Sequence, residues 1–149
     1  MKTDLKVRAI HQGGMRVLAN DGEFDVRMDY PMAPNETTTG PTPLTMLLAS
    51  LAACSLNSVQ VILKKMQQPV KSLQVEARGT RRTEHPTLLT DIELEFTVNR
   101  GVDQAAMARA LQLSEERLCP VWNMLKASTP IKASFHMQPD NEPAAAHAR

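Results

Sequence analysis

The sequence is poor in the residue types that mark several specialised classes of protein. Only two of its 149 residues are cysteine, Cys54 and Cys119, too few for a disulfide-stapled scaffold or a cysteine-rich zinc site. Aromatic residues make up 3%, too few for the stacking surfaces of single-strand nucleic-acid binders. Seventeen Lys and Arg against 16 Asp and Glu leave a net charge of +1, so no strongly basic field exists to attract nucleic acid. The open question is whether the two thiols pack or react.

We expect neither a targeting segment nor a membrane span. The N-terminus is charged and alternating, without the apolar run of a signal peptide. The one long uncharged stretch, 37–63, contains Gly40, Pro41 and Pro43 in its first part. Polar side chains interrupt its second part (Thr45, Ser50, Ser55, Asn57, Ser58 and Gln60). A helix buried in a protein core is therefore favoured. We expect a cytoplasmic protein with no membrane contact, in which a permanent structural disulfide is disfavoured.

The pattern of apolar residues predicts one α+β domain over residues 1–138, followed by a disordered tail over 139–149. A long helix is expected from Pro43, with Thr42 as its N-cap, to just before Pro69. Asp103 is expected to cap a second helix, and Cys119-Pro120 to open a short third one. Strands are expected at 5–9, 15–19, 24–28, 70–82, 89–98 and 131–137, of which 70–82 and 89–98 form an antiparallel pair with one solvated face.

The local sequence gives the two cysteines different interpretations. Cys54 lies mid-helix among small apolar residues, a setting typical of an inert buried thiol, since free cysteine is among the most buried residue types. Pro120 places the Cys119 sulfur near a helix N-terminus, where the dipole favours the thiolate, and for this residue packing and chemistry are equally open. No histidine shares a local spacing with either cysteine, so neither a metal site nor a Cys/His nucleophile is expected.

Three segments, in this order along the chain, together resemble a known family. The hairpin RVLANDGEFDVRM comes first, and GPTPLTMLLASLAACSLNSVQVILKKMQQPV, which contains Cys54, follows it. The last segment is LSEERLCPVWNMLKASTPIKASF, which contains Cys119. They resemble the osmotically inducible protein C / organic hydroperoxide resistance (OsmC/Ohr) family from about Lys6 to Met137.

The resemblance implies an OsmC-like α+β fold, in which antiparallel sheets wrap around long central helices in an intertwined homodimer. It also implies a cysteine-based, peroxiredoxin-like reduction of organic hydroperoxides in the oxidative stress response. Cys54 would be the peroxidatic thiol and Cys119 the resolving thiol. A thiolate attacks the peroxide and becomes a sulfenic acid, with which a second thiol condenses to a disulfide. Relatives reopen that disulfide with lipoyl-type dithiols, and no cofactor or metal is implied.

The chain departs from the family pattern at the groups that activate the reactive sulfur. The well-studied peroxide reductases have an arginine on the first hairpin, held by a glutamate at the start of the central helix. In an ungapped alignment the arginine position falls near Gly13, and Leu44 and Thr45 stand at the glutamate position. Arg16 is the candidate cation partner, and the 78–82 strand offers other arginines. An unperturbed cysteine has a pKa of about 8.5, so a nearby cation is needed to increase the thiolate fraction.

Three hypotheses therefore stand. The first is a thiol-dependent peroxidase of the OsmC/Ohr type that uses Cys54 and Cys119. The second is a non-catalytic dimer of the same fold that binds a small apolar ligand or senses oxidants, as the missing Arg/Glu pair suggests. The third is that both cysteines merely pack.

Overall fold

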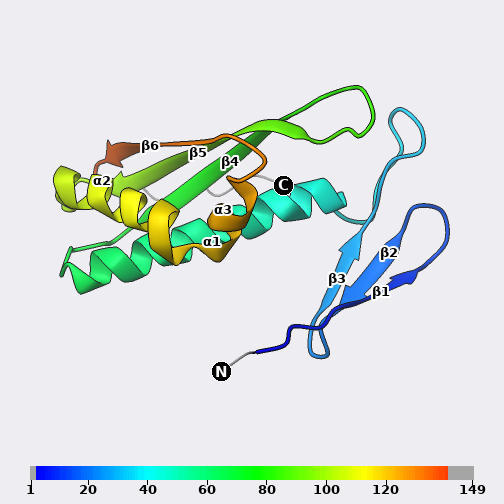
Figure 1. Cartoon of the computed structure of the whole chain (residues 1–149), viewed down its shortest axis with the longest axis horizontal. Coiled ribbons are helices and arrows are strands. Elements are labelled where there is room, and N and C mark those ends of the chain that lie inside the picture. The colour runs from blue at the N-terminus through cyan, green and yellow to red at the C-terminus, as the bar shows by residue number, and fades with distance from the viewer. Residues whose placement is uncertain (1–2, 141–149) are drawn as a thin grey trace. The chain divides into compact units, whose positions relative to one another are not determined.

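The structure, a computed structural model, describes residues 3–140, and it confirms the α+β class (Figure 1). Its elements are, in chain order, β1 (Arg8–His11), β2 (Val17–Asn20), β3 (Asp25–Met28), α1 (Pro43–Lys65), β4 (Leu73–Arg81), β5 (Leu89–Asn99), α2 (Gln104–Leu113), the π-helical turn η1 (Ser114–Leu118), α3 (Pro120–Leu125) and β6 (Ile131–Gln138). The chain divides into two compact units, with the boundary between Leu47 and Leu48. The single domain over 1–138 stays a prediction, and the tail expected to be disordered lies, apart from Pro139 and Asp140, outside the described residues.

The first unit is built on an antiparallel three-stranded sheet of order β1-β2-β3. Asp21 closes the expected β2–β3 turn, because its carboxylate accepts the backbone N–H groups of Glu23 and Phe24. After β3, the buried Asp29 carboxylate accepts the backbone N–H and the hydroxyl of Thr39 at 2.9 and 3.1 Å. Mainly because of the Thr39 N–H, the pKa of Asp29 lies below its usual value. Asp29 thereby anchors the loop that leads to α1.

The second unit contains a mixed sheet of order β4-β5-β6. The β4–β5 pair is antiparallel, as predicted, whereas β6 joins β5 in parallel. The expectation of purely antiparallel sheets is wrong here, because the chain passes through α2, η1 and α3 before β6, and such a crossover returns the chain in the same direction. The apolar face of the sheet carries residues that alternate along β5, namely Ile92, Leu94, Phe96 and Val98, each at most 1% exposed.

Helix α1 begins and ends close to the predicted positions. The Thr42 hydroxyl accepts the Thr45 N–H at 3.2 Å, which confirms Thr42 as the N-cap. The helix buries one face, which consists of Leu51, Ser55, Val59, Ile62 and Leu63. Among the described residues α1 is the one helix that is long and apolar enough to cross a membrane, judged by length and composition alone. Core helices of soluble proteins meet the same criterion.

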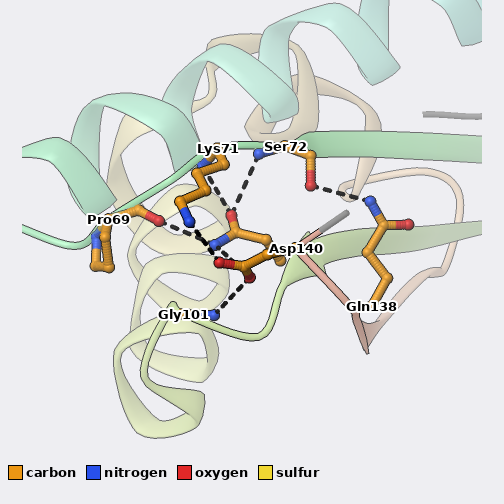
Figure 2. Close-up of polar contacts among 7 residues, drawn as sticks. Pro69, Lys71, Ser72, Gly101, Gln138 and Asp140 are labelled. Atoms are coloured by element: carbon orange, nitrogen blue, oxygen red, sulfur yellow. Dashed lines mark hydrogen bonds and ion pairs between the residues drawn. The ribbon is translucent and has the colours of Figure 1, made fainter. Parts of the chain in front are cut away.

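A polar cluster ties together the segments around α1, β5 and β6 (Figure 2). The fully buried Asn99 side chain accepts the backbone N–H groups of Lys71 and Ser72 at 2.8 and 3.2 Å and donates to the Pro69 carbonyl at 3.0 Å. Asp140, after β6, pairs with the Lys71 ammonium at 2.7 Å, and this contact is the largest cause that lowers the pKa of Asp140. The cluster fixes the path of the chain at the ends of three elements.

Candidate functional site

Cys54 lies in the middle of α1 and is half-buried. The neighbouring residues in the helix are small, so the helix can approach other elements closely at this point. Ser58, one turn later, donates its hydroxyl to the Cys54 carbonyl at 2.8 Å. The rigid helix, rather than a loop, therefore fixes the position of the thiol.

Cys119 lies between η1 and α3, and its backbone is held on both sides. Its N–H donates to the Ser114 carbonyl at 2.9 Å, the i to i−5 bond that defines a π-helical turn. Its carbonyl accepts the Asn123 N–H at 3.1 Å and the Asn123 side-chain amide at 2.9 Å. The same amide also donates to the Glu115 carbonyl, so Asn123 bridges η1 and α3. Sequence reasoning missed both the π-turn and this role of Asn123.

The two thiols lie close together although they are far apart in the sequence. The Cys119 side chain is fully buried, and the Cys54 thiol is near enough to act on its pKa. Burial, and then the Cys54 side chain, raise the pKa of Cys119 from 9.0 to about 11. The Trp122 N–H donates to the Cys119 sulfur at 3.4 Å and opposes the increase. The site therefore presents a fixed, protonated thiol next to a more accessible one.

The pKa of Cys119 corrects one expectation from the sequence. Cys119 is the N-cap of α3, as Pro120 suggested, and backbone N–H groups do favour its thiolate. Complete burial outweighs them, because removing a charged sulfur from water costs more than two amide contacts return. The thiolate of Cys119 is thus disfavoured, contrary to the interpretation based on the helix dipole alone.

The candidate cations have polar contacts of their own. Arg16 belongs to the first unit, where its guanidinium donates to the Gly13 carbonyl at 3.4 Å, whereas both cysteines belong to the second unit. Arg78 is engaged with Glu76 at 2.7 Å and Glu95 at 3.9 Å. It points to the face of the sheet opposite to its neighbour Gly79, which lies against Leu48 of α1. Arg78 is therefore not a cation partner of Cys54 in this structure, and the role of Arg16 stays a prediction.

A groove of about 650 Å³ lies beside this site, between α2 and β6. Its apolar lining includes Leu111, Trp122, Phe135 and Met137. The indole N–H of Trp122 is buried and has no hydrogen-bond partner within residues 3–140. In the same part of the chain, no group of three or more His, Cys, Asp and Glu side chains is arranged to hold a metal ion. The groove has the size of a small-molecule site, and its lining is about equally polar and apolar.

Known proteins share the sequence pattern and the fold of this chain. The family model described as "OsmC-like protein" matches residues 34–134. Protein YhfA of Escherichia coli strain K12 is 37% identical over 107 residues, which cover 71% of this chain and 80% of YhfA. A hypothetical protein from Aquifex aeolicus VF5 has a similar crystal structure, with a TM-score of 0.81 and 28% identity over 92% of this chain and 98% of that one.

The organic hydroperoxide resistance protein OhrB of Bacillus subtilis shares the fold at 20% identity, with a TM-score of 0.66, covering 90% of this chain and 98% of that one. The family-model match spans more than half of this chain, and the resemblance of the Cys54 and Cys119 segments is confirmed. The chain therefore belongs to the OsmC-like protein family.

Proposed function

We propose that this protein is a thiol-dependent peroxidase that reduces organic hydroperoxides in the oxidative stress response, with Cys54 as the peroxidatic and Cys119 as the resolving thiol. The observation that carries the proposal is the proximity of the two thiols, one half-buried and the other fully buried. A purely packing role would not require two thiols to meet. The shared fold with a protein named for organic hydroperoxide resistance supports the choice of substrate.

The chemistry needs only the two sulfurs and a reductant. The Cys54 thiolate attacks one peroxide oxygen, the O–O bond breaks, and the alcohol leaves with a proton while Cys54 becomes a sulfenic acid. Cys119 then loses its proton and attacks the Cys54 sulfur, which releases water and forms the disulfide. Two electrons pass from the thiols to the peroxide. A dithiol of the lipoyl type returns them, and no cofactor or metal takes part.

The raised pKa of Cys119 should slow the second step at neutral pH. Only about one Cys119 in 10⁴ is a thiolate at pH 7 if its pKa is about 11. Formation of the disulfide should therefore accelerate about tenfold per pH unit between pH 7 and pH 9. We propose Arg16 as the cation that favours the Cys54 thiolate, and an Arg16→Ala variant should then slow the first step while an Arg16→Lys variant keeps part of the rate.

The protein is proposed to act as an intertwined homodimer in the cytoplasm, without nucleic acid or membrane as a partner. The described chain exposes many large apolar side chains, among them Leu5, Phe24 and Met32, at 94%, 69% and 70%. Apolar surface of this extent is typical of an interface. Light scattering coupled to size exclusion would measure the mass of the assembly, and a monomer at micromolar concentration would contradict the dimer.

The test is peroxide consumption with cumene hydroperoxide as substrate and dihydrolipoate as reductant. We expect activity in the wild type, none in Cys54→Ser, and in Cys119→Ser one reaction per chain that leaves a sulfenic acid on Cys54. Gln60→Ala, at an exposed position on another face of the same helix, is the matched control and should keep full activity. Equal consumption by the wild type and Cys54→Ser would refute the peroxidase.

A second candidate function is the binding of a small apolar ligand in the groove between α2 and β6. The apolar side chains in its lining, Leu111, Trp122, Phe135 and Met137, favour it, because they would cover the hydrocarbon part of such a ligand. Isothermal titration with medium-chain fatty acids and their alcohols tests this function. Binding that Trp122→Phe weakens, in a chain without peroxidase activity, would favour it over the first proposal.

A further inference from the structure

The two sulfurs of the candidate site differ in how a reagent can reach them. Cys119 has no exposed surface, and hydrogen bonds to Ser114 and Asn123 fix its backbone. Cys54 is half-buried, on the face of α1 that is not fully covered by the second unit. A thiol that reduces the disulfide attacks one of its two sulfurs and must approach that sulfur along the axis of the S–S bond. Only one of the two sulfurs allows that approach without opening of the structure.

We propose that thiol reductants attack the disulfide at Cys54 alone, so that the mixed disulfide forms on Cys54 and Cys119 is the leaving sulfur. This inference rests on the proposed function only in that it assumes the Cys54–Cys119 disulfide. It assigns the reductant a point of attack, the Cys54 sulfur, and it gives the two cysteines different roles in regeneration as well as in oxidation.

The step balances as an ordinary thiol–disulfide exchange. The reductant thiolate forms a bond to the Cys54 sulfur, the Cys54–Cys119 bond breaks, and its electron pair goes to Cys119, which takes up a proton. A second thiolate of the same dithiol then attacks the reductant sulfur of the mixed disulfide. It releases the Cys54 thiolate and the oxidised, cyclic reductant.

The acidity of the two thiols and their burial favour attack at different sulfurs, and burial determines which sulfur the reductant reaches. The raised pKa of Cys119 makes it a poor leaving group, so acidity alone opposes attack at Cys54. Attack at Cys119, however, requires access to a side chain with no exposed surface. Once released, Cys119 is held protonated, since its pKa is raised to about 11. It therefore attacks the mixed disulfide slowly, and even a monothiol adduct on Cys54 should persist at pH 7.

The experiment uses the full chain, oxidised to the disulfide with diamide so that peroxidase activity is not needed. The oxidised protein is treated with glutathione at pH 7, quenched with acid, alkylated with N-ethylmaleimide and digested with trypsin. Cys54 and Cys119 fall in separate peptides, 28–64 and 118–126. We expect glutathione on the first peptide and N-ethylmaleimide on the second, with at least a tenfold preference.

A second measurement follows the loss of the glutathione adduct after free glutathione is removed. The loss should accelerate about tenfold per pH unit from pH 7 to pH 9, as Cys119 ionises and closes the disulfide again. Cys119→Ser, loaded with glutathione on Cys54, is the control and should keep its adduct at each pH. Unfolding in guanidinium before glutathione is added should abolish the preference between the two peptides.

Glutathione on peptide 118–126, or equally on both peptides in the folded protein, would overturn the inference, as would rapid loss of the adduct at pH 7. A failure of diamide to form the disulfide would overturn this inference together with the proposed resolving step. If glutathione enters at Cys54 but the protein consumes no peroxide, this inference stands and the peroxidase function fails.

Discussion

The two units of the chain bury apolar side chains to very different extents. Among residues 3–140, fifteen of the sixteen buried hydrophobic residues lie in the second unit, and the first contributes only Ala19. The first unit instead exposes Leu5, Phe24 and Met32 by two thirds of their surface or more. A three-stranded sheet needs an apolar face packed against something to be stable. The second unit supplies its own core, whereas the first leaves its large apolar side chains exposed, and the proposed homodimer would cover them.

The largest expected effect comes from a matched pair of phenylalanines. Phe96 is fully buried in the second unit and Phe24 is 69% exposed in the first. Phe96→Ala should lower the free energy of unfolding by about 3–5 kcal/mol, because it leaves a cavity in the core. Phe24→Ala should change it by less than about 0.5 kcal/mol in the isolated chain, but weaken self-association. Urea unfolding at several protein concentrations separates the two effects, and equal losses in dilute monomer would refute the contrast.

A pair of asparagines gives the next effect in size. Asn99→Ala in the second unit removes a fully buried side chain and leaves the Lys71 and Ser72 N–H groups without their acceptor, which should cost about 2–3 kcal/mol of unfolding free energy. Asn20, in the first unit, is half-buried and bonds Gly22 and Asp25. Asn20→Ala should cost about 0.5–1 kcal/mol. The same denaturation assay measures both, and a smaller loss at Asn99 than at Asn20 would contradict the importance of the cluster.

Two glycines test how each unit tolerates a methyl group. An added Cβ at Gly40, in the first unit, would collide with the carbonyl of Arg27, which is backbone. At Gly79, in the second unit, it would meet the end of the Leu89 side chain at 2.9 Å, which can move. We expect Gly40→Ala to lower the free energy of unfolding by about 1–3 kcal/mol and Gly79→Ala by less than about 1 kcal/mol. The reverse order in thermal unfolding would show that the loop after β3 adapts more easily than the core.

Low pH should destabilise both units, and added salt should distinguish the contributions of Asp29 and Asp140. Asp29 in the first unit and Asp140 in the second both have a pKa below the usual 3.8 in the folded protein. The unfolded chain therefore takes up protons first, and stability that is present above about pH 5 is lost as pH falls through the folded pKa values. Asp29 relies mainly on Thr39 and Asp140 on Lys71.

Added salt should weaken the contribution of Asp140, an ion pair, more than that of Asp29. Unfolding curves of Asp29→Asn and Asp140→Asn from pH 2 to pH 6, with and without 0.5 M NaCl, measure the two contributions. Each variant should reduce the dependence of the unfolding free energy on pH in the acid range. The effect of salt on this dependence should disappear in Asp140→Asn. A salt effect that disappears in Asp29→Asn instead would contradict the assignment.

Local signals account for the elements that the sequence predicted well. Thr42 and Pro43 begin α1, and Asp103 caps α2 by accepting the Ala106 N–H at 2.8 Å, because these residue types act within one turn of the chain. Strand β1 begins at Arg8 rather than at Leu5, although the alternation extends to Leu5. Pairing limits it, since Arg8 lies opposite Asn20, the last residue of β2.

What the sequence could not predict depends on contacts between distant segments. The parallel register of β5 and β6 and the links from Asn99 to Lys71 and Asp140 join residues that no local pattern connects. The pairing of Cys54 with Cys119 came from resemblance to a family and not from spacing. The raised pKa of Cys119 was beyond sequence reasoning, because burial is a property of the folded chain.

The π-helical turn before Cys119 has a consequence for how this family can gain and lose residues. The Cys119 N–H bonds the carbonyl five residues before it, whereas an α-helix bonds the carbonyl four residues before. The turn η1 therefore holds one residue more than an α-helical turn would. Loss of one residue from this turn would rotate whatever follows by about 100° around the helix axis and turn the sulfur away from Cys54. Lineages that lost a residue here would need to place their second thiol elsewhere, so the length of this turn should be inherited together with the cysteine pair.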